Sequence, residues 1–356
     1  MSHAPRLEID LDKIYHNAHT LVQRLNGRGI SVTGVMKATL GSSNIAKVLL
    51  RAGVTSLGDS RIESIESMRQ ANVSSAMTLI RSPMISQAAQ VIKFADISFN
   101  TEMKVIRQLS IEAEKADRIH RVLLMVELGD LREGIMPDDL IEAVRETCRM
   151  SNIVLEGIGT NLACRSGVCP DANNMATLSK LANTIETTLG QSINIVSGGN
   201  SANLKWALSD ADTGRINNLR LGEAILLGCE TLHRQPITGL YTDAITLIAE
   251  VIESKIKPTK VVGGIAQTAF GSKQTIKDRG SILQTILAVG IQDIDPEGLQ
   301  GPKGIKICGA SSDHLVLETA GDQLSVGSEV SFQLNYSALL RAMTSPFVAK
   351  LYKYKG

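Results

Sequence analysis

The chain has 356 residues, of which 43% are hydrophobic and 21% are charged, a composition typical of soluble globular proteins. Because the formal net charge is only +1 and no long block of like charge occurs, neither nucleic acid nor an acidic membrane surface is an implied partner. No stretch reaches the roughly 18 apolar residues of a membrane span, and charged residues interrupt the N-terminus before an apolar leader forms. The five cysteines lack paired spacing, so we expect a cytoplasmic protein, and no metal site is indicated.

The opening segment LEIDLDKIYHNAHTL predicts a strand, at about residues 6–10, and then a helix. From about residue 30 to 230, short apolar runs alternate with amphipathic stretches, as buried parallel strands and their covering helices require. We expect strands within Ser31–Lys37, Ser56–Ser60, Ala76–Arg81, Asp96–Asn100, Arg121–Leu128, Val154–Asn161, Ile193–Gly198 and Asn218–Ala224, and helices within Asn44–Ala52, Ile62–Ala71, Met103–Lys115, Asp138–Arg149 and Asn173–Leu189. Eight such units over roughly 200 residues predict a closed (β/α)8 TIM-type barrel. A doubly wound open sheet is the alternative, and the count of eight favours the barrel.

The pattern changes after about Leu232, where alternating segments bounded by Gly, Pro, Asp and Ser predict an antiparallel β-domain. Its expected strands are Asp243–Ile252, Ser281–Val289, Ile305–Cys308, Leu315–Thr319, Val330–Asn335 and Val348–Tyr352, with a short helix at Tyr336–Ala342. We therefore expect a barrel over residues 1–232 and a C-terminal β-domain over residues 233–356. The first strand, at about residues 6–10, is able to pack on the β-domain instead of the barrel.

Function in such a barrel belongs to the carboxyl ends of the strands and the loops after them. Lys37 stands out because it ends the first strand, where an apolar residue is expected. A lysine in this position either extends its ammonium group to the rim, or has a lowered pKa and forms a Schiff base with an aldehyde. Other polar residues follow the strands in the same way: Asp59, Arg61, Glu127, Asp130, Arg132, Asn161, Cys164, Ser197–Ser201 and Arg220.

The segment SGGNS favours a phosphate ligand near this lysine. Two glycines followed by Asn200 and Ser201, just before a helical stretch, would offer backbone N–H groups to a phosphate. LRLGEA places a further glycine in the neighbouring loop. Each glycine segment alone fits a tight turn, but together with Lys37 they favour an aldehyde cofactor that carries a phosphate.

These motifs, in their order along the chain, resemble the fold-type III pyridoxal-phosphate enzymes, and in particular the alanine racemase family, with the closest likeness to its alanine/ornithine racemase-like branch. The likeness extends from LEIDLDKIYHNAHTL through VMKA, DLREG, GTNLA, SGGNSA and LRLGEAILLG to ILAVGIQD, GASSDH and YSALLRAM. It implies pyridoxal 5′-phosphate as cofactor, an amino acid as substrate, and a head-to-tail homodimer in which one β-domain caps the other subunit's barrel.

The resemblance also implies roles for single residues. Lys37 is similar to the Schiff-base lysine, which also serves as one of the two racemisation bases. Arg132 resembles the arginine that hydrogen-bonds the ring hydroxyl of the cofactor. Arg220 resembles the arginine that faces the pyridine nitrogen, keeps it unprotonated and so limits side reactions. The phosphate would be bound by Ser201, by the backbone N–H groups of Gly222 and Glu223, and by the hydroxyl of Tyr336.

Four positions depart from the alanine racemase pattern. Ile291, in VGIQDID, stands where the family's catalytic tyrosine is expected. Met125 corresponds to a barrel lysine that is often carbamylated, and Asn161 to the histidine that stacks over the pyridine ring. KATLGSSN, after Lys37, contains no counterpart of a further tyrosine. These changes argue against a plain alanine racemase that uses a Lys/Tyr pair.

Racemisation needs a second base, or one base that swings, and the candidates are Asp293, Asp313, His314 and Cys164. His314 is a candidate because a histidine titrates near neutrality, as a proton-transfer group should. The segment SSDH, which contains Asp313 and His314, also fits a plain turn. A cysteine such as Cys164 is more often a buried small hydrophobe than a base. Asp293 fits a loop cap or a partner for a substrate amine equally well. Acidic groups and the loss of bulky tyrosines favour a longer cationic substrate, such as ornithine or lysine.

Three other functions fit the same scaffold. The first is an alanine racemase or a broad-specificity racemase, and the second is a fold-type III decarboxylase. Decarboxylases of this fold type tend to have a longer β-domain with a catalytic motif that contains a cysteine. Cys308 is the one residue here that resembles that cysteine, and we expect Cys308 in the core. The third is a non-catalytic pyridoxal-phosphate-binding protein, which Ile291 keeps open. The small members of that class lack a β-domain, so the residues after Leu232 argue against them.

Overall fold

The computed structural model describes residues 4–271, 278–321 and 323–354. Contacts within the chain divide it into two compact units. Asp12–Tyr241 forms the first unit, called the barrel, and the second unit, called the β-domain, joins the N-terminal segment through Leu11 to the segment from Thr242 onward.

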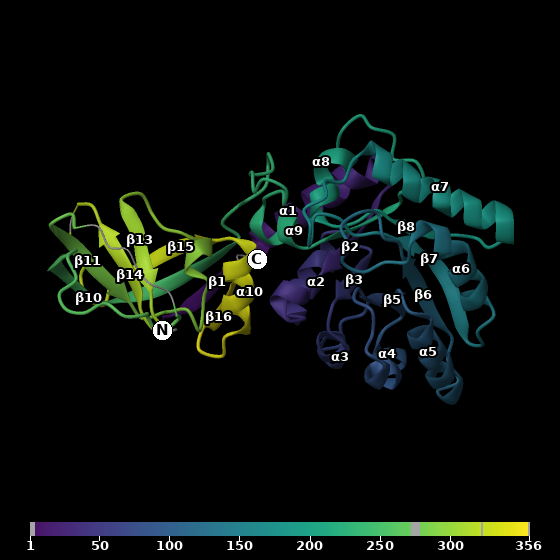
Figure 1. Ribbon diagram of the computed structural model, residues 1–356, viewed down its shortest axis with the longest axis horizontal. Helices are drawn as coiled ribbons and strands as arrows, with labels where there is room; N and C mark the ends of the chain where they lie inside the picture. Colours follow the sequence, from purple (N-terminus) through teal and green to yellow (C-terminus); the bar gives the residue numbers. More distant parts are fainter. Residues whose placement is uncertain (1–3, 272–277, 322, 355–356) are drawn as a thin grey trace. The chain divides into compact units, whose positions relative to one another are not determined.

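The barrel is a closed ring of eight parallel strands in sequence order, from β2 to β9 (Figure 1). Residues of β2 pair with β9, for example Thr33 with Arg220, and this pairing closes the ring. The strands are β2 (Ser31–Val35), β3 (Ser56–Asp59), β4 (Met77–Leu79), β5 (Ile97–Asn100), β6 (His120–Met125), β7 (Ile153–Gly159), β8 (Ile195–Ser197) and β9 (Asn218–Leu221). The closed ring confirms the predicted TIM-type barrel and excludes the open doubly wound sheet.

Helices follow the strands and cover the outside of the ring (Figure 1). They are amphipathic; in α2, for example, Ile45, Val48 and Leu49 are buried while Lys47 is exposed. The short helix α4 was not among the expected ones, and it buries Val91 and Ile92. The helices of this unit are α1 (Leu11–Asn26), α2 (Ser43–Arg51), α3 (Ile62–Gln70), α4 (Ala88–Phe94), α5 (Met103–Lys115), α6 (Leu140–Cys148), α7 (Ala172–Leu189), α8 (Leu204–Ala207) and α9 (Glu223–Leu227), with 3-10 turns η1 (Lys37–Thr39), η2 (Ile85–Gln87), η3 (Pro137–Asp139) and η4 (Ser201–Asn203).

Apolar side chains pack together inside the barrel. Phe99, Leu123 and Met125 belong to one buried cluster, against which Ile80 and Ile195 pack. Met125, the counterpart of the carbamylated lysine, is only 2% exposed. An apolar side chain at this position therefore serves the packing of the barrel interior.

The β-domain is an eight-stranded, mostly antiparallel sheet, which confirms the predicted second architecture. Its main path runs in the order β12-β15-β10-β11-β14-β13, and β1 pairs antiparallel with β10 and parallel with β16. The elements are β1 (Arg6–Asp10), β10 (Ile245–Pro258), β11 (Ser281–Leu287), β12 (Leu299–Gln300), β13 (Ile305–Ala310), β14 (Leu315–Thr319), β15 (Glu329–Leu334), β16 (Ala349–Lys353), the helix α10 (Tyr336–Thr344) and the turn η5 (Pro296–Gly298).

The division of the chain falls at Tyr241, beyond the boundary expected after Leu232. The buried Asn17 of α1 explains the difference. Its Nδ2 donates to the carbonyls of Ile225 and Tyr241, at 3.0 and 2.8 Å, and its Oδ1 accepts the N–H of Tyr241. Residues after Leu232 are thereby hydrogen-bonded to the barrel, whereas β1 lies in the β-domain sheet.

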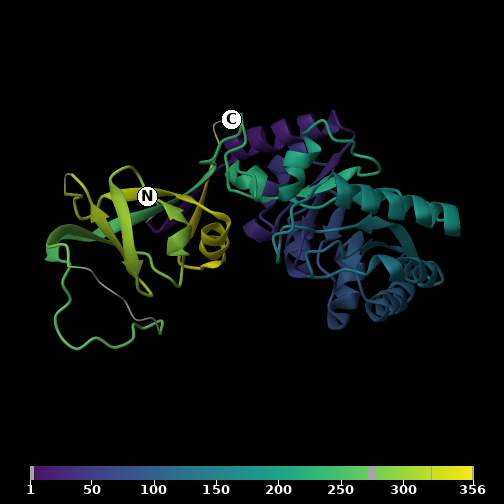
Figure 2. The same cartoon turned by 45° about the horizontal axis from the view of Figure 1, so that its top comes forward.

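β10 continues to Pro258, beyond the Ile252 that the sequence pattern predicts (Figure 2). The segment after it exposes large apolar side chains: Val262 is 90% exposed and Ile265 is 64% exposed. Among the described helices, none is long and apolar enough to cross a membrane.

Candidate active site at the carboxyl end of the barrel

Lys37 lies at the point where the chain leaves β2. Met36 still donates its N–H to the carbonyl of Gly58, at 2.8 Å, and Lys37 then begins the turn η1. Thr39 Oγ1 donates to the Met36 carbonyl, and Leu40 adopts a left-handed φ of 52°. The chain therefore turns sharply after the strand and leaves Lys37 half-buried at the carboxyl end of the barrel.

Three carboxylates from different elements lie within electrostatic range of Lys37. Burial raises the pKa of Asp59 to about 6, and burial also raises the pKa values of Glu133 and Glu223. In each case the charge of Lys37 opposes the rise. The Lys37 ammonium is therefore surrounded by acidic groups at this end of the barrel.

Arg220 of β9 is 4% exposed and is held by three acceptors. Its Nη1 donates to Ser197 Oγ at 2.7 Å, and its Nη2 donates to the Thr160 carbonyl at 2.8 Å and to Asn161 Oδ1 at 3.2 Å. The guanidinium also lies 5.0 Å from the ring centre of Phe99. Burial, with a smaller contribution from the charge of Arg132, lowers the pKa of Arg220 to about 10, so it stays charged at neutral pH.

Arg132 and Glu133, after β6, form a bidentate pair. Arg132 Nη2 donates to Glu133 Oε1 at 2.6 Å, and its Nε lies 2.5 Å from Oε2. Arg132 Nη1 also lies 3.2 Å from the sulfur of Cys164. Cys164 is exposed, in contrast to the buried position that is usual for cysteine. The structure thus brings Arg132, Cys164 and Arg220 together.

The loop that carries Cys164 is built around the buried carboxylate of Asp130. The backbone N–H groups of Arg165, Ser166, Cys164 and Val168 donate to this carboxylate, over distances of 2.8 to 3.4 Å. Burial raises the pKa of Asp130, but these four donors outweigh burial, and the pKa lies below its ordinary value.

Replacing Asp130 with alanine leaves four N–H groups without their acceptor, so we expect the free energy of unfolding at pH 7 to fall by about 2 kcal/mol. Because the folded-state pKa is lowered, the carboxylate stabilises the fold above its unfolded-state pKa, and this stabilisation is lost as pH falls through the folded-state value. Urea unfolding at neutral and acidic pH should show that the free energies of unfolding of wild type and Asp130→Ala become similar in acid. The exposed Asp138→Ala is the control, and an equal loss in both variants would contradict this role of Asp130.

Backbone N–H groups gather after β8 and β9. The side chain of Asn200 caps η4 by accepting the N–H of Ala202 at 2.7 Å, and its Nδ2 donates to Asn161 Oδ1 and the Leu162 carbonyl. Ser201 is the first residue of η4, and its Oγ accepts the N–H of Ala224, in α9, at 3.3 Å. Helix geometry leaves the first N–H groups of η4 and α9 without acceptors inside the helix. This region therefore offers N–H donors and a hydroxyl to an anion.

Gly199 shows why glycine is needed in this loop. Its φ is +146°, and a Cβ built there would lie 2.1 Å from Oδ1 of Asn203. That oxygen accepts the N–H of Asn200, so a side chain at Gly199 would break the cap.

Three buried polar atoms at this end of the barrel have no hydrogen-bond partner among the described residues: Oδ2 of Asp59, Oδ1 of Asn100 and Nδ2 of Asn161. Unpaired buried polar atoms are costly, so each calls for an explanation, and a further bound group is one such explanation. With the amine of Lys37, the donors of Arg132 and Arg220, and the N–H groups around Ser201 and Gly222, the site suits a phosphate-bearing aldehyde such as pyridoxal 5′-phosphate.

The other expected residues lie in the β-domain. Asp293 is 6% exposed and accepts the hydroxyl of Ser345 at 2.6 Å, a geometry that favours a structural role. Asp313 and His314 are exposed. Asp313 accepts from Gln292 Nε2 at 2.6 Å and from the Ser312 hydroxyl at 2.7 Å. Tyr336 is the first residue of α10, directly after the capping residue Asn335.

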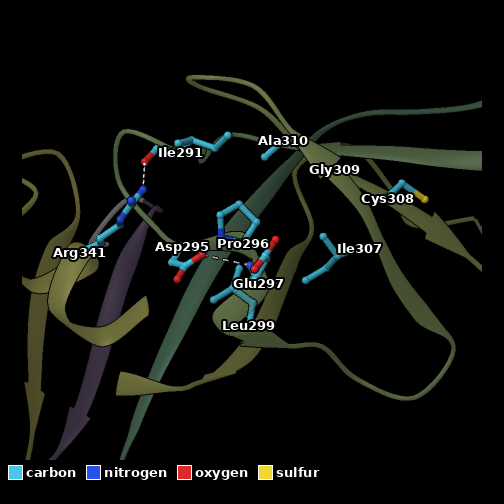
Figure 3. A pocket seen from close by; sticks show the side chains of 10 residues that line it. All are labelled: Ile291, Asp295, Pro296, Glu297, Leu299, Ile307, Cys308, Gly309, Ala310 and Arg341. Atoms are coloured by element: carbon cyan, nitrogen blue, oxygen red, sulfur yellow. Dashed lines mark hydrogen bonds between the residues drawn. The ribbon is translucent and has the colours of Figure 1, made fainter. Parts of the chain in front are cut away.

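Ile291 lies in the turn after β11, and its carbonyl accepts Nη1 of Arg341 at 3.1 Å. It lines a β-domain cavity of about 620 Å³ (Figure 3). The other lining residues are Asp295, Pro296, Glu297, Leu299, Ile307, Cys308, Gly309, Ala310 and Arg341. Cys308 is exposed, so the expectation of a core position is wrong; it belongs to β13, an edge strand of the sheet, and lines this cavity.

Two polar residues of the barrel site were not among the expected ones. Glu133 pairs with Arg132, and Arg234 forms an ion pair with Glu223. Glu133 directly follows an expected site residue, and this adjacency was the available signal. Arg234 lies after the last strand–helix unit, and its pattern gives no indication of a place beside Glu223.

Comparison with known proteins adds to this geometry. Residues 9–229 match the family model described as the N-terminal domain of alanine racemase. The chain is 38% identical to a lysine racemase of Thermotoga maritima over 98% of both chains. It is 35% identical to an ornithine racemase of Acetoanaerobium sticklandii, over 97% of this chain and 99% of the relative. Among solved structures, the alanine racemase of Streptomyces coelicolor matches with a TM-score of 0.77 at 18% identity, and 98% of each chain is covered.

Proposed function

The chain belongs to the alanine racemase family, and from this premise we propose that it is a pyridoxal 5′-phosphate-dependent racemase of basic amino acids such as lysine and ornithine. The observation that carries the proposal is the placement of Lys37, half-buried at the end of a barrel strand beside arginines, carboxylates and N–H donors. Likeness to a lysine racemase and an ornithine racemase over nearly the whole chain supports the substrate class.

The residues that would hold the cofactor have distinct roles. Lys37 would bind it covalently through its amino group, and Arg132 would donate to its ring hydroxyl. Arg220 would present a fixed positive charge to the ring nitrogen, because its three acceptors leave it little freedom. Ser201 and the backbone N–H groups of Gly222 and Glu223 would bind the phosphate, and Asn200 holds this loop through its cap. The family resemblance gives Tyr336, in the β-domain, the role of a hydroxyl donor to the phosphate.

When bound, pyridoxal 5′-phosphate withdraws electrons from an attached amino acid and so acidifies its α-hydrogen. The protein must then remove a proton from one face of the α-carbon and return one to the other. Lys37 Nζ is the group that we propose for one face, because Lys37 is the amine at the carboxyl end of the barrel where the cofactor would bind.

The candidates for the proton-transfer group on the other face of the α-carbon come from both the barrel and the β-domain. Cys164 stands at the barrel mouth with its sulfur against Arg132. His314 and Asp313 are exposed in the β-domain, and Asp293 is the weakest candidate because its carboxylate is buried against Ser345. Ile291 has no titratable group, so a tyrosine does not act at that position.

We further propose a head-to-tail homodimer in which the β-domain of one copy covers the barrel mouth of the other. The family resemblance supports this arrangement, and it would bring His314 and Asp313 of one copy to the Lys37 of its partner. A cytoplasmic location is consistent with five free cysteines.

The test is to incubate the purified protein and its cofactor with single L-amino acids and to separate the enantiomers by chiral chromatography. We expect kcat/KM for lysine and ornithine to exceed that for alanine by about tenfold or more, because a site with acidic groups discriminates a cationic side chain from a methyl group. Higher turnover of alanine would contradict the substrate class and favour an alanine or broad-specificity racemase.

Two further readouts separate the other chemistries. Release of carbon dioxide from an L-amino acid would indicate a decarboxylase. Absence of α-hydrogen exchange in heavy water, with the cofactor bound, would indicate a non-catalytic binding protein.

A further inference from the structure

Asn218 is a polar residue at a position of the barrel interior where an apolar one is usual. It is 7% exposed and lies on β9 two residues before Arg220, so the two side chains leave the same face of the strand. That face points inward, because the Arg220 guanidinium lies over Phe99 of the interior cluster. Asn218 pairs in register with Ser197 of β8 on one side and with Ser31 of β2 on the other. Branched apolar side chains usually fill such positions, so a buried asparagine here calls for an explanation.

The hydrogen bonds between these side chains run in one direction. Arg220 can only donate, so its Nη1 makes Ser197 Oγ an acceptor, at 2.7 Å. The single proton of that hydroxyl is donated to Oδ1 of Asn218, at 2.6 Å. Nδ2 of Asn218 donates in turn to Ser31 Oγ at 3.2 Å and to Thr33 Oγ1 at 3.0 Å. The series of donors therefore runs from Arg220 through Ser197 and Asn218 to β2.

The orientation of the Asn218 amide is fixed by its neighbours. Ser31 donates its own hydroxyl proton to the carbonyl of Asn217, at 2.8 Å, so it can only accept from Asn218. The amide must therefore present its NH2 group to Ser31 and its oxygen to Ser197. Because a hydroxyl hydrogen turns to suit its partners, the Asn218 oxygen holds the Ser197 proton and keeps a Ser197 lone pair directed at Arg220.

The Arg220 guanidinium is thereby held at both ends of its fork. Nη2 donates to the Thr160 carbonyl and to Asn161, whereas Ser197 Oγ is the one acceptor that the described residues offer to Nη1. Asn218, Ser197 and Arg220 are all buried, so water does not readily replace a lost partner. Removing the Ser197 acceptor, or the amide that orients it, would release one end of the guanidinium.

We propose that Asn218 is a positioning residue for Arg220. Acting through the Ser197 hydroxyl, it holds the guanidinium where the nitrogen of the cofactor ring would lie. The proposal rests on the proposed cofactor and on the role of Arg220 toward it. An arginine fixed at that nitrogen keeps it unprotonated and so limits transamination. Asn218 thus favours racemisation over transamination, although it acts through another side chain.

The first test is a double-mutant cycle in the cofactor-free protein, measured by urea unfolding. Asn218→Ala and Arg220→Met are made singly and together. We expect their effects on the unfolding equilibrium constant to depart from additivity by about tenfold, because the two residues belong to one hydrogen-bond network. In a Ser197→Ala background this coupling should disappear. Asn17→Ala is the matched control: Asn17 is also a buried asparagine with three hydrogen bonds, and its effect should add to that of Arg220→Met.

The second test does not require Arg220→Met to fold, since Ser197→Ala removes a single oxygen atom. The cofactor-loaded variant is incubated with the amino acid that wild type racemises fastest, and the opposite enantiomer and the 2-oxo acid are measured together. In transamination the amino acid becomes its 2-oxo acid and the aldehyde cofactor becomes the amine, with no net use of an oxidant or of water. We expect the ratio of 2-oxo acid to racemised product to rise about tenfold in Ser197→Ala and in Asn218→Ala, the effect of losing one hydrogen bond to a charged group.

Ser98→Ala is the matched control for the product ratio. Ser98 is likewise fully buried on a barrel strand, and its hydroxyl is hydrogen-bonded to another side chain, His120, at 2.8 Å. This variant should keep the wild-type ratio, because general loosening of the barrel lowers both products together.

The outcomes separate this proposal from the proposed function. Additive effects of Asn218→Ala and Arg220→Met would overturn the role of Asn218, as would coupling that persists without Ser197. An unchanged product ratio in folded Ser197→Ala would overturn it as well. If wild type racemises no amino acid, the proposed function is overturned instead, and the cycle in the cofactor-free protein still decides whether Asn218 acts on Arg220.

Discussion

Replacing Lys37 with alanine is expected to reduce racemisation by at least about 10³-fold and to remove the visible absorbance of the lysine-bound cofactor. The covalent attachment point and one proton-transfer group are lost together, and a positioned acid or base alone contributes about 10²–10⁴-fold. The measurements are chiral chromatography of the product and the absorption spectrum of the purified variant with added cofactor.

Lys47→Ala is the matched control, because Lys47 is an exposed lysine on the adjacent helix α2. It should keep both the spectrum and the activity. Circular dichroism separates loss of the amine from loss of the fold. A normal absorbance band in folded Lys37→Ala would show that another lysine binds the cofactor.

Replacing Arg220 with methionine is expected to lower the free energy of unfolding by about 3 kcal/mol. The substitution keeps an apolar stem but removes the guanidinium donor from Ser197 Oγ and the Thr160 carbonyl, and leaves Asn161 Oδ1 with Asn200 Nδ2 as its donor. Arg220→Lys should recover only part of the loss, because one ammonium does not reproduce the fork of the guanidinium. Urea unfolding of the cofactor-free protein measures the effect.

The control for this change is Arg121→Met. Arg121 is 46% exposed and its nitrogen lies 3.9 Å from Glu156, so its loss should cost less than about 1 kcal/mol. Since Asn161 also binds Asn200, Arg220→Met should weaken cofactor binding by disturbing the capped loop. Unchanged stability and unchanged cofactor affinity would contradict the role of Arg220 as the centre of this network.

Much of the architecture could be predicted from the sequence because the signal is local. Each barrel strand is a short apolar run next to an amphipathic helix, and eight repetitions identify the closed ring. Lys37 was found for the same reason: a charged residue at the end of an apolar run is visible without a structure. The glycines of SGGNS were equally visible, and Gly199 does adopt a backbone conformation that L side chains rarely adopt.

Local patterns failed where burial depends on distant residues. Cys308 has the neighbours of a core residue in sequence, but β13 is an edge strand and its cysteine is exposed. The contacts that divide the chain at Tyr241 are equally distant in sequence, because Asn17 of α1 binds Tyr241.

The residues and motifs of the sequence thus determined the barrel, the β-domain and the position of Lys37 at the end of the first barrel strand. Only the tertiary structure decided which charges surround that lysine. Asp59, Glu133 and Glu223 come from three separate loops or strands, and Arg132 and Arg234 neutralise two of them. Electrostatic energies depend on distance and burial in space, and neither quantity is written in the spacing of residues along the chain.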